Sequence, residues 1–156
     1  MKLKIFNRKE TKRIVDKLNR QFGVEEIQGI FIQMGKERLF LFQGSFSRKE
    51  IIELSQISQM ERVGVYFGKE IKDEVRLSME GAQLLKDQIT KNIFELNSEQ
   101  AEQWMKGQEL LIETGKKDFL VMKYNDNFLG CGKASEKKIG NYIPKNRRLK
   151  EKNLRV

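Results

Sequence analysis

The spacing of apolar residues predicts a helix and a hairpin at the start of the chain. Residues 10–22 carry apolar side chains every three or four positions and are followed by Gly23, a pattern typical of an amphipathic helix and its end. Strands are expected over Ile27–Met34 and Arg38–Gln43. The short connection 35–37 between them contains glycine and polar residues, so the two strands should pair as a β-hairpin.

A capped helix and a second pair of strands are expected next. Ser47 and Glu50 have capping-box spacing before a helix that runs to about Ile57. Phe46 and Ile51 flank this start, where they can form a hydrophobic staple. The elements that follow are strands over residues 62–68 and 74–78, then a helix over residues 79–88 capped by Ser78.

From residue 91 onward the pattern changes to short strands around one helix. A strand over residues 92–96 leads into a helix that opens on Asn97 or Ser98 and ends at Gly107. Further strands are expected over residues 110–113, 119–124, 128–134 and 138–143, the last one stopped by Pro144. Short strands with polar turns favour a small β-barrel. No Gly/Ser/Pro-rich linker separates the two parts, so we expect them to pack together.

The distribution of charged residues along the chain indicates what kind of molecule the protein binds. The chain has 156 residues, with 31 lysines and arginines against 22 acidic residues. The excess lies at the two ends: residues 133–156 hold nine basic residues against Glu136 and Glu151, and residues 1–20 are also basic. Such concentrated charge suits a polyanion, because each phosphate contact releases condensed counterions. Solvated helix faces and a disordered tail over 145–155 are the alternative explanation.

The sequence offers little for catalysis. It has no histidine, which excludes a His-dependent triad, and it has no Gly-rich nucleotide loop. The lone Cys131 is expected to be a small core residue, with a reactive thiol as the alternative. Asp73, Glu74 and Asp87 lack the spacing of a metal site. We therefore expect no enzyme activity, no cofactor and no metal, in a cytoplasmic protein without a signal peptide or membrane span.

Binding chemistry is concentrated in the last quarter of the chain. Lysine and arginine can grip phosphates, an asparagine amide can read a base edge, and a tyrosine ring can stack on a base. Two glycines on one strand, Gly130 and Gly132, either let another backbone approach or make room for Trp104 in the core. The candidate RNA-binding residues are Lys133, Lys137, Lys138, Asn141, Tyr142, Lys145, Arg147 and Arg148.

The same stretch resembles a known RNA-binding module. Residues 119–133, FLVMKYNDNFLGCGK, resemble the signature of PUA domains, in which a hydrophobic strand, a tight turn and a Leu-Gly-x-Gly strand recur. Residues 139–148, IGNYIPKNRR, are similar to the PUA-like C-terminal region of RNA cytosine-C5 methyltransferases. Upstream, residues 62–85 resemble the α/β domain that precedes the PUA domain in a ribosome-biogenesis factor. The methyltransferase catalytic domain, with its cofactor loop and paired cysteines, has no counterpart here.

This resemblance implies an α+β protein with two modules. An N-terminal α/β, pre-PUA-like domain (residues 1–90) would pack on a small C-terminal PUA-type β-barrel with a basic tail (residues 91–156). The implied function is non-catalytic binding of rRNA or tRNA, as an accessory factor in RNA modification or ribosome biogenesis. Possible partners are an RNA methyltransferase or a ribosome-assembly protein. The alternative is an interaction adaptor that docks a methyltransferase without binding RNA tightly.

Overall fold

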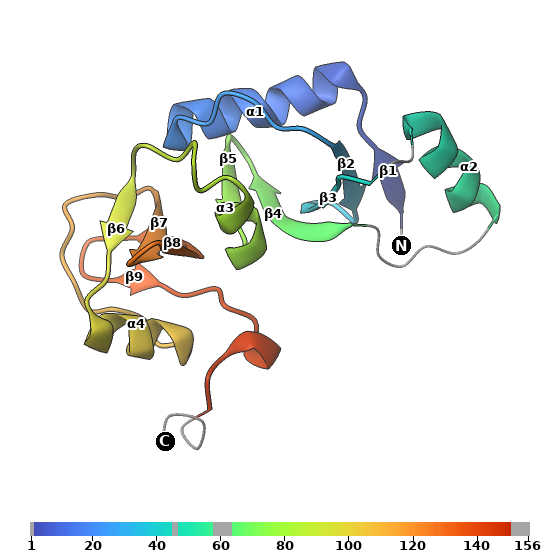
Figure 1. Cartoon of the computed structure of the whole chain (residues 1–156). Coiled ribbons are helices and arrows are strands. Elements are labelled where there is room, and N and C mark those ends of the chain that lie inside the picture. The colour runs from blue at the N-terminus through green and yellow to red at the C-terminus, as the bar shows by residue number, and fades with distance from the viewer. Residues whose placement is uncertain (1, 45–46, 58–63, 151–156) are drawn as a thin grey trace.

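The chain forms two β-sheets beside each other, in a computed structural model that describes residues 2–44, 47–57 and 64–150 (Figure 1). The first sheet is antiparallel, with strands β1 (Leu3–Ile5), β2 (Ile30–Met34), β3 (Arg38–Phe42), β4 (Val65–Ile71) and β5 (Glu74–Leu77) in that order. The second sheet has the order β6 (Ile93–Glu95), β7 (Phe119–Tyr124), β8 (Asn127–Ala134) and β9 (Ile139–Gly140). Strand β6 is parallel to β7, and the other pairs are antiparallel. The helices are α1 (Arg8–Phe22), α2 (Arg48–Ile57), α3 (Met79–Leu84) and α4 (Ser98–Met105), with a 3₁₀ turn at Lys145–Arg147.

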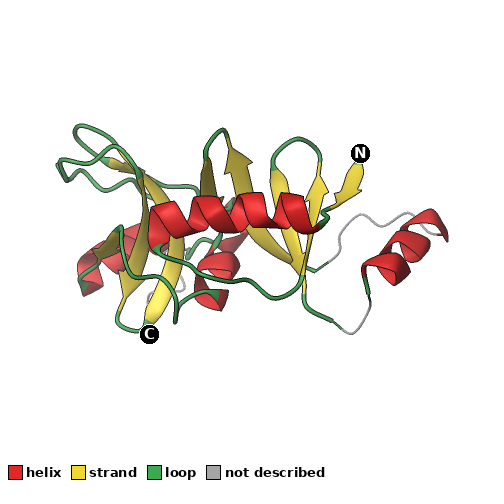
Figure 2. Cartoon of the chain, turned by 90° about the horizontal axis from the view of Figure 1, so that it is seen from above, coloured by secondary structure: helices red, strands yellow, loops and turns green. Residues whose placement is uncertain are grey.

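Helix α1 confirms the first predicted element and begins two residues earlier than expected. Asn7 caps it: the Asn7 side chain accepts from the Glu10 amide at 2.9 Å, and the Glu10 carboxylate accepts from the Asn7 amide at 3.0 Å. Gly23 ends it with a φ of 84°, a left-handed conformation that glycine adopts readily. The apolar face of the helix packs on the first sheet (Figure 2).

The predicted hairpin and capping box are also confirmed. Strands β2 and β3 pair in register from Ile30–Phe42 to Met34–Arg38. At the start of α2, the Ser47 hydroxyl accepts from the Glu50 amide at 3.2 Å, and the Glu50 carboxylate accepts from the Ser47 amide at 3.1 Å. Phe46 of the proposed staple and the beginning of the predicted strand 62–68 lie outside the described residues.

Helix α3 is shorter than its sequence pattern indicates. Ser78 caps it as predicted, since its hydroxyl accepts from the Gly81 amide at 2.9 Å. The helix ends at Leu84 rather than at residue 88. The Gln88 side chain accepts from the backbone amides of Glu25 and Glu26, at 2.9 and 3.1 Å. This tertiary contact draws the chain toward the end of α1 and accompanies the early end of the helix.

The second sheet curls into a half-barrel around a buried tryptophan. Trp104 of α4 is fully buried, and its indole N–H donates to the Leu129 carbonyl at 3.1 Å. A Cβ atom at Gly132 would lie 2.7 Å from the Trp104 ring, so the glycine makes room for the indole. Along β7, Phe119 and Val121 face the core shared with the first sheet, whereas Leu120 and Met122 face the tryptophan. Burial on both faces explains why residues 119–122 of this strand are all apolar.

Two predicted strands of the barrel are reduced in the structure. The expected strand over residues 110–113 is wrong except for one isolated bridge between Leu110 and Ile139, and Leu111 is 84% exposed. Strand β9 ends at Gly140 instead of reaching residue 143. The Asn141 side chain bonds to backbone groups of its neighbours here, which takes the place of strand pairing.

The two sheets share one hydrophobic core. Phe67, Val75 and Leu77 of the first sheet belong to the same buried cluster as Phe128 and Cys131 of the second. Gly130, with a φ of 79°, lies where a Cβ atom would be 3.2 Å from the Met79 amide nitrogen at the start of α3. This close approach joins β8 to the β5–α3 connection. Within the described part of the chain, no helix is long and apolar enough to cross a membrane.

Candidate nucleic-acid interface

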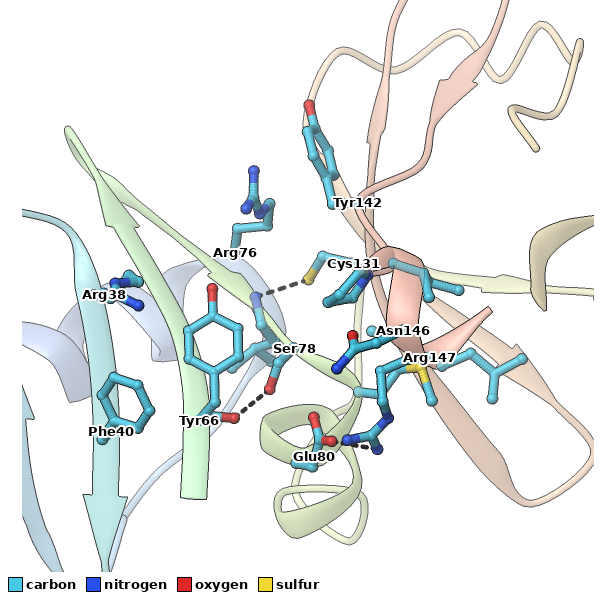
Figure 3. A pocket seen from close by; sticks show the side chains of 16 residues that line it. Arg38, Phe40, Tyr66, Arg76, Ser78, Glu80, Cys131, Tyr142, Asn146 and Arg147 are labelled. Carbon is cyan, nitrogen blue, oxygen red and sulfur yellow. Dashed lines mark hydrogen bonds and ion pairs between the residues drawn. The ribbon is translucent and has the colours of Figure 1, made fainter. Parts of the chain in front are cut away.

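A groove of about 340 Å³ lies between the outer face of the first sheet and the C-terminal segment. One wall is formed by Arg38 and Phe40 of β3, Tyr66 of β4 and Arg76 of β5, which alternate with residues that face the core. The opposite wall is formed by Tyr142, Asn146 and Arg147 (Figure 3). The groove thus combines side chains that are far apart in the sequence.

Guanidinium and aromatic groups lie in contact within this groove. The Arg76 guanidinium lies over the Tyr142 ring, 4.0 Å from its centroid, in a cation–π arrangement. The rings of Phe40 and Tyr66 are 5.4 Å apart and tilted by 49°. Burial raises the pKa of Tyr66, and the nearby cation of Arg76 opposes this only in part. The phenol is therefore neutral at physiological pH.

The acidic residue of the groove is paired. Glu80, at the start of α3, forms an ion pair with Arg147 across the groove (Figure 3). With Arg38 and Arg76 on the first wall, the groove carries three guanidinium groups against this one carboxylate. Its net charge is positive, which favours an anionic ligand.

The floor of the groove is made of backbone and an inert thiol. The Leu77 amide donates to Cys131 Sγ at 3.3 Å, and the Ser78 hydroxyl donates to the Tyr66 carbonyl at 2.6 Å. Burial raises the pKa of Cys131 to about 12, so the thiol stays protonated. Cys131 is 4% exposed, which agrees with the core role expected from the sequence. Its position supplies no nucleophile.

Of the predicted RNA-binding residues, Tyr142 and Arg147 line the groove and Lys145 lies exposed between them in sequence. Lys133 lies on β8 and Lys138 in the turn between β8 and β9, each beside an acidic residue. Lys133 Nζ is 3.5 Å from Glu74 and 4.5 Å from the centroid of the Phe119 ring. Lys138 Nζ is 3.0 Å from Glu109. Such half-exposed pairs contribute little and exchange readily for phosphate.

Asn141 and Arg148 hold the segment in place. The Asn141 amide donates to the carbonyls of Trp104 and Gln108, at 2.8 and 3.0 Å, while its oxygen accepts from the Ile143 amide at 2.8 Å. Arg148 Nε donates to the Ile143 carbonyl at 2.8 Å, and the side chain packs over Gly107. Both side chains therefore have structural roles, and their predicted contacts to RNA stay a prediction.

The groove residues that the sequence-based candidates missed include Arg38, Tyr66 and Arg76 of the first sheet. Their strand positions do carry a signal, because each alternates with a buried neighbour and so must face away from the core. Nothing in the sequence, however, indicates that this outer face meets the C-terminal segment. Gly132, in contrast, makes room for Trp104, which was one of the two expectations, and Gly130 lets the protein's own backbone approach at Met79.

Metal chemistry has no support in the described ranges. No three aspartate, glutamate or cysteine side chains gather there in a way that could hold an ion.

Comparisons with known proteins find similarity that includes the C-terminal part of the chain. Residues 91–149 match the family model described as the Methyltransferase RsmF PUA domain. The chain is 26% identical over 128 residues to a protein of Psychromonas ingrahamii named ribosomal RNA small subunit methyltransferase F. That match covers 80% of this chain but 26% of the relative, so the chain spans about a quarter of the methyltransferase's length.

The longer match also bears on the first sheet. A match that covers 80% of this chain must extend well upstream of residue 91, where the domain model begins. The likeness of residues 62–85 to a ribosome-biogenesis factor stays a prediction. Together, the two matches confirm the resemblance found in the sequence: this chain is similar to the PUA-like region of the RNA cytosine-C5 methyltransferases.

Proposed function

We propose that this protein binds RNA without catalysing a reaction on it, through the groove and the basic residues beside it. The observation that carries the proposal is the clustering of Arg38 and Arg76 of the first sheet with Arg147, which lies within the segment that matches a PUA domain. Guanidinium groups suit phosphate recognition, because their planar donors can engage two oxygens at once.

Exposed lysines extend this positive surface. Lys137 and Lys145 are exposed, and neither has an ion-pair partner among the residues that the structure describes. Their ammonium groups keep their counterions until a polyanion replaces them, and this release drives binding. The same surface would bind weakly at high salt.

The RNA is proposed to be ribosomal or transfer RNA. The similar protein of Psychromonas ingrahamii is named for ribosomal RNA of the small subunit, which favours rRNA. The role would be that of an accessory factor in RNA modification or ribosome assembly, in the cytoplasm and beside an RNA methyltransferase. Binding of structured RNA by an auxiliary domain can position a substrate for a separate catalytic domain.

Charge reversal beside the groove tests the function. The double variant Lys145→Glu, Arg147→Glu should bind rRNA and tRNA roughly tenfold more weakly, or weaker still, at about 50 mM salt. The slope of log affinity against log salt should fall by about 1 to 2, since up to two phosphate contacts are lost. Arg148 is left unchanged because it holds the segment in place. Fluorescence polarisation at about 50 and 200 mM salt measures both quantities.

A matched control separates local contacts from net charge. Lys86→Glu with Lys91→Glu makes the same change of charge at exposed positions beyond the far end of α3. This control should lose clearly less affinity and keep its salt slope. Equal losses in both variants, or weak RNA binding that ignores salt, would contradict the proposal, and the second result would favour the adaptor function instead.

A further inference from the structure

We propose that the groove is a subsite for one unstacked nucleotide of single-stranded RNA, an inference that rests on the proposed RNA-binding function. Tyr142 and Arg76 would stack on the base, and Arg38 would contact the adjoining phosphate. The size, the aromatic groups and the polar groups of the groove together indicate this ligand.

The size of the groove fits a single nucleotide. Its volume of about 340 Å³ lies at the lower end of the range for small-ligand pockets, about 300–1,000 Å³. A base within a duplex is stacked between its neighbours and cannot enter a concave site of this kind. A base in a loop, a bulge or a single strand can be splayed out and inserted.

The rim offers a stacking surface that nothing in the described structure fully covers. The Tyr142 ring is 42% exposed, although buried residues adjoin it in sequence. Its contacts are the Arg76 guanidinium at 4.0 Å and the Phe119 ring, whose centroid is 6.4 Å away. A guanidinium plane is itself a stacking partner for a base. The pair therefore presents an aromatic and cationic surface suited to a nucleobase.

Polar groups at the opposite wall face the space that a base edge would occupy. Asn146 points into the groove and is exposed, with an amide that can both donate and accept (Figure 3). Glu80 and Arg147 lie beside it as an ion pair. These groups match the mixed donors and acceptors of a Watson–Crick edge, which only an unpaired base presents.

The two walls are held in a fixed relation. The Leu77 amide bonds to Cys131 Sγ at the floor, and the clusters behind both walls form one core. The Asn141 and Arg148 hydrogen bonds fix the segment that carries Tyr142. A preformed site of this kind avoids much of the ordering cost of binding.

The test compares two RNAs with the same number of phosphates. One is an unpaired strand of about 12 nucleotides with a central 2-aminopurine, and the other is a blunt-ended, fully paired duplex with the same total number of phosphates. The full-length protein should bind the strand about tenfold more tightly, and the fluorescence of 2-aminopurine should change when the base stacks. Tyr142→Ala should remove most of this preference, about tenfold, and should weaken binding of the duplex clearly less than binding of the strand. Tyr142→Phe keeps the ring and should keep the preference.

The outcomes separate the subsite from the function. Equal affinity for strand and duplex, or equal losses for both RNAs in Tyr142→Ala, would overturn the subsite while RNA binding stands. No binding of either RNA at low salt would overturn the proposed function and the subsite with it. Unchanged thermal unfolding of Tyr142→Ala checks that the variant folds, and the 2-aminopurine signal of the unaltered protein tests stacking without any variant.

Discussion

Asn141 shows how one side chain can set the shape of a binding surface without touching a ligand. Its amide group satisfies three backbone groups, on Trp104, Gln108 and Ile143. Strand β9 ends just before it, and Tyr142 is turned toward the groove directly after it. The position of Tyr142 therefore depends on Asn141.

Replacing Asn141 with alanine should destabilise the protein. Three hydrogen bonds are lost and the backbone groups left behind are partly buried, so the free energy of unfolding should fall by about 2 kcal/mol. Asn146→Ala is the matched control, because Asn146 is exposed, and it should change stability by less than about 0.5 kcal/mol. Urea denaturation followed by Trp104 fluorescence measures both variants. Similar stabilities for the two would show that Asn141 does not hold the segment.

At the scale of elements, α1 is fastened to β4 by an ion-pair cluster. Glu70 of β4 accepts from Arg13 Nε and Nη2, at 2.9 and 3.0 Å, and from Lys17 Nζ at 2.7 Å. Lys17 is 8% exposed and also donates to the Lys72 carbonyl. Burial acts to raise the pKa of Glu70, but the hydrogen bonds from Arg13 and Lys17 outweigh it, so the pKa is lowered.

Replacing Glu70 with glutamine should therefore lower the free energy of unfolding by an amount that depends on pH. Removal of the carboxylate leaves Lys17 buried without its partner, and the free energy of unfolding at pH 7 should fall by about 2 kcal/mol. Because the pKa is lowered on folding, the ionised group stabilises the fold above the ordinary glutamate value of about 4.3. This contribution is lost as the pH falls through the lowered folded-state pKa. The stability difference between the two proteins should thus be constant from pH 7 to about 5 and shrink below about 4.

Chemical denaturation at several pH values gives this difference directly. Glu74→Gln serves as the control, since the Glu74 pair with Lys133 is only partly buried and longer, at 3.5 Å. If the difference in free energy of unfolding between the unaltered protein and Glu70→Gln is as large at pH 3 as at pH 7, the role assigned to the cluster is contradicted.

Elements fixed by local chemistry could be predicted from the sequence, whereas those fixed by tertiary contacts could not. Helix α1 and α4 carry their own caps, Asn7 and Asn97, and the β2–β3 hairpin has its own turn. The end of α3 depends instead on Gln88 meeting the end of α1. At residues 110–113 only the Leu110–Ile139 bridge forms, and its partner strand β9 ends at Gly140.

At the scale of the whole molecule, the same distinction applies to the candidate site. Tyr142 and Arg147 were among the predicted residues because they lie in a basic, PUA-like stretch. Arg38, Tyr66 and Arg76 lie on strands whose outer face is defined by alternation alone. Only the packing of the two sheets on one core brings these groups together, and this contact joins residues more than 60 positions apart. The alternation of buried and exposed residues along one strand does not reveal which distant segment packs against its exposed face.

Photo-crosslinking tests most directly whether RNA occupies the groove between the first sheet and the C-terminal segment. A single-stranded RNA of about 12 nucleotides containing 4-thiouridine would be irradiated with the full-length protein, and the crosslinked peptides mapped by mass spectrometry. We predict crosslinks at Tyr142 and Tyr66, which lie on opposite walls of the groove. Crosslinks confined to the basic helix α1, with none at either tyrosine, would contradict the account.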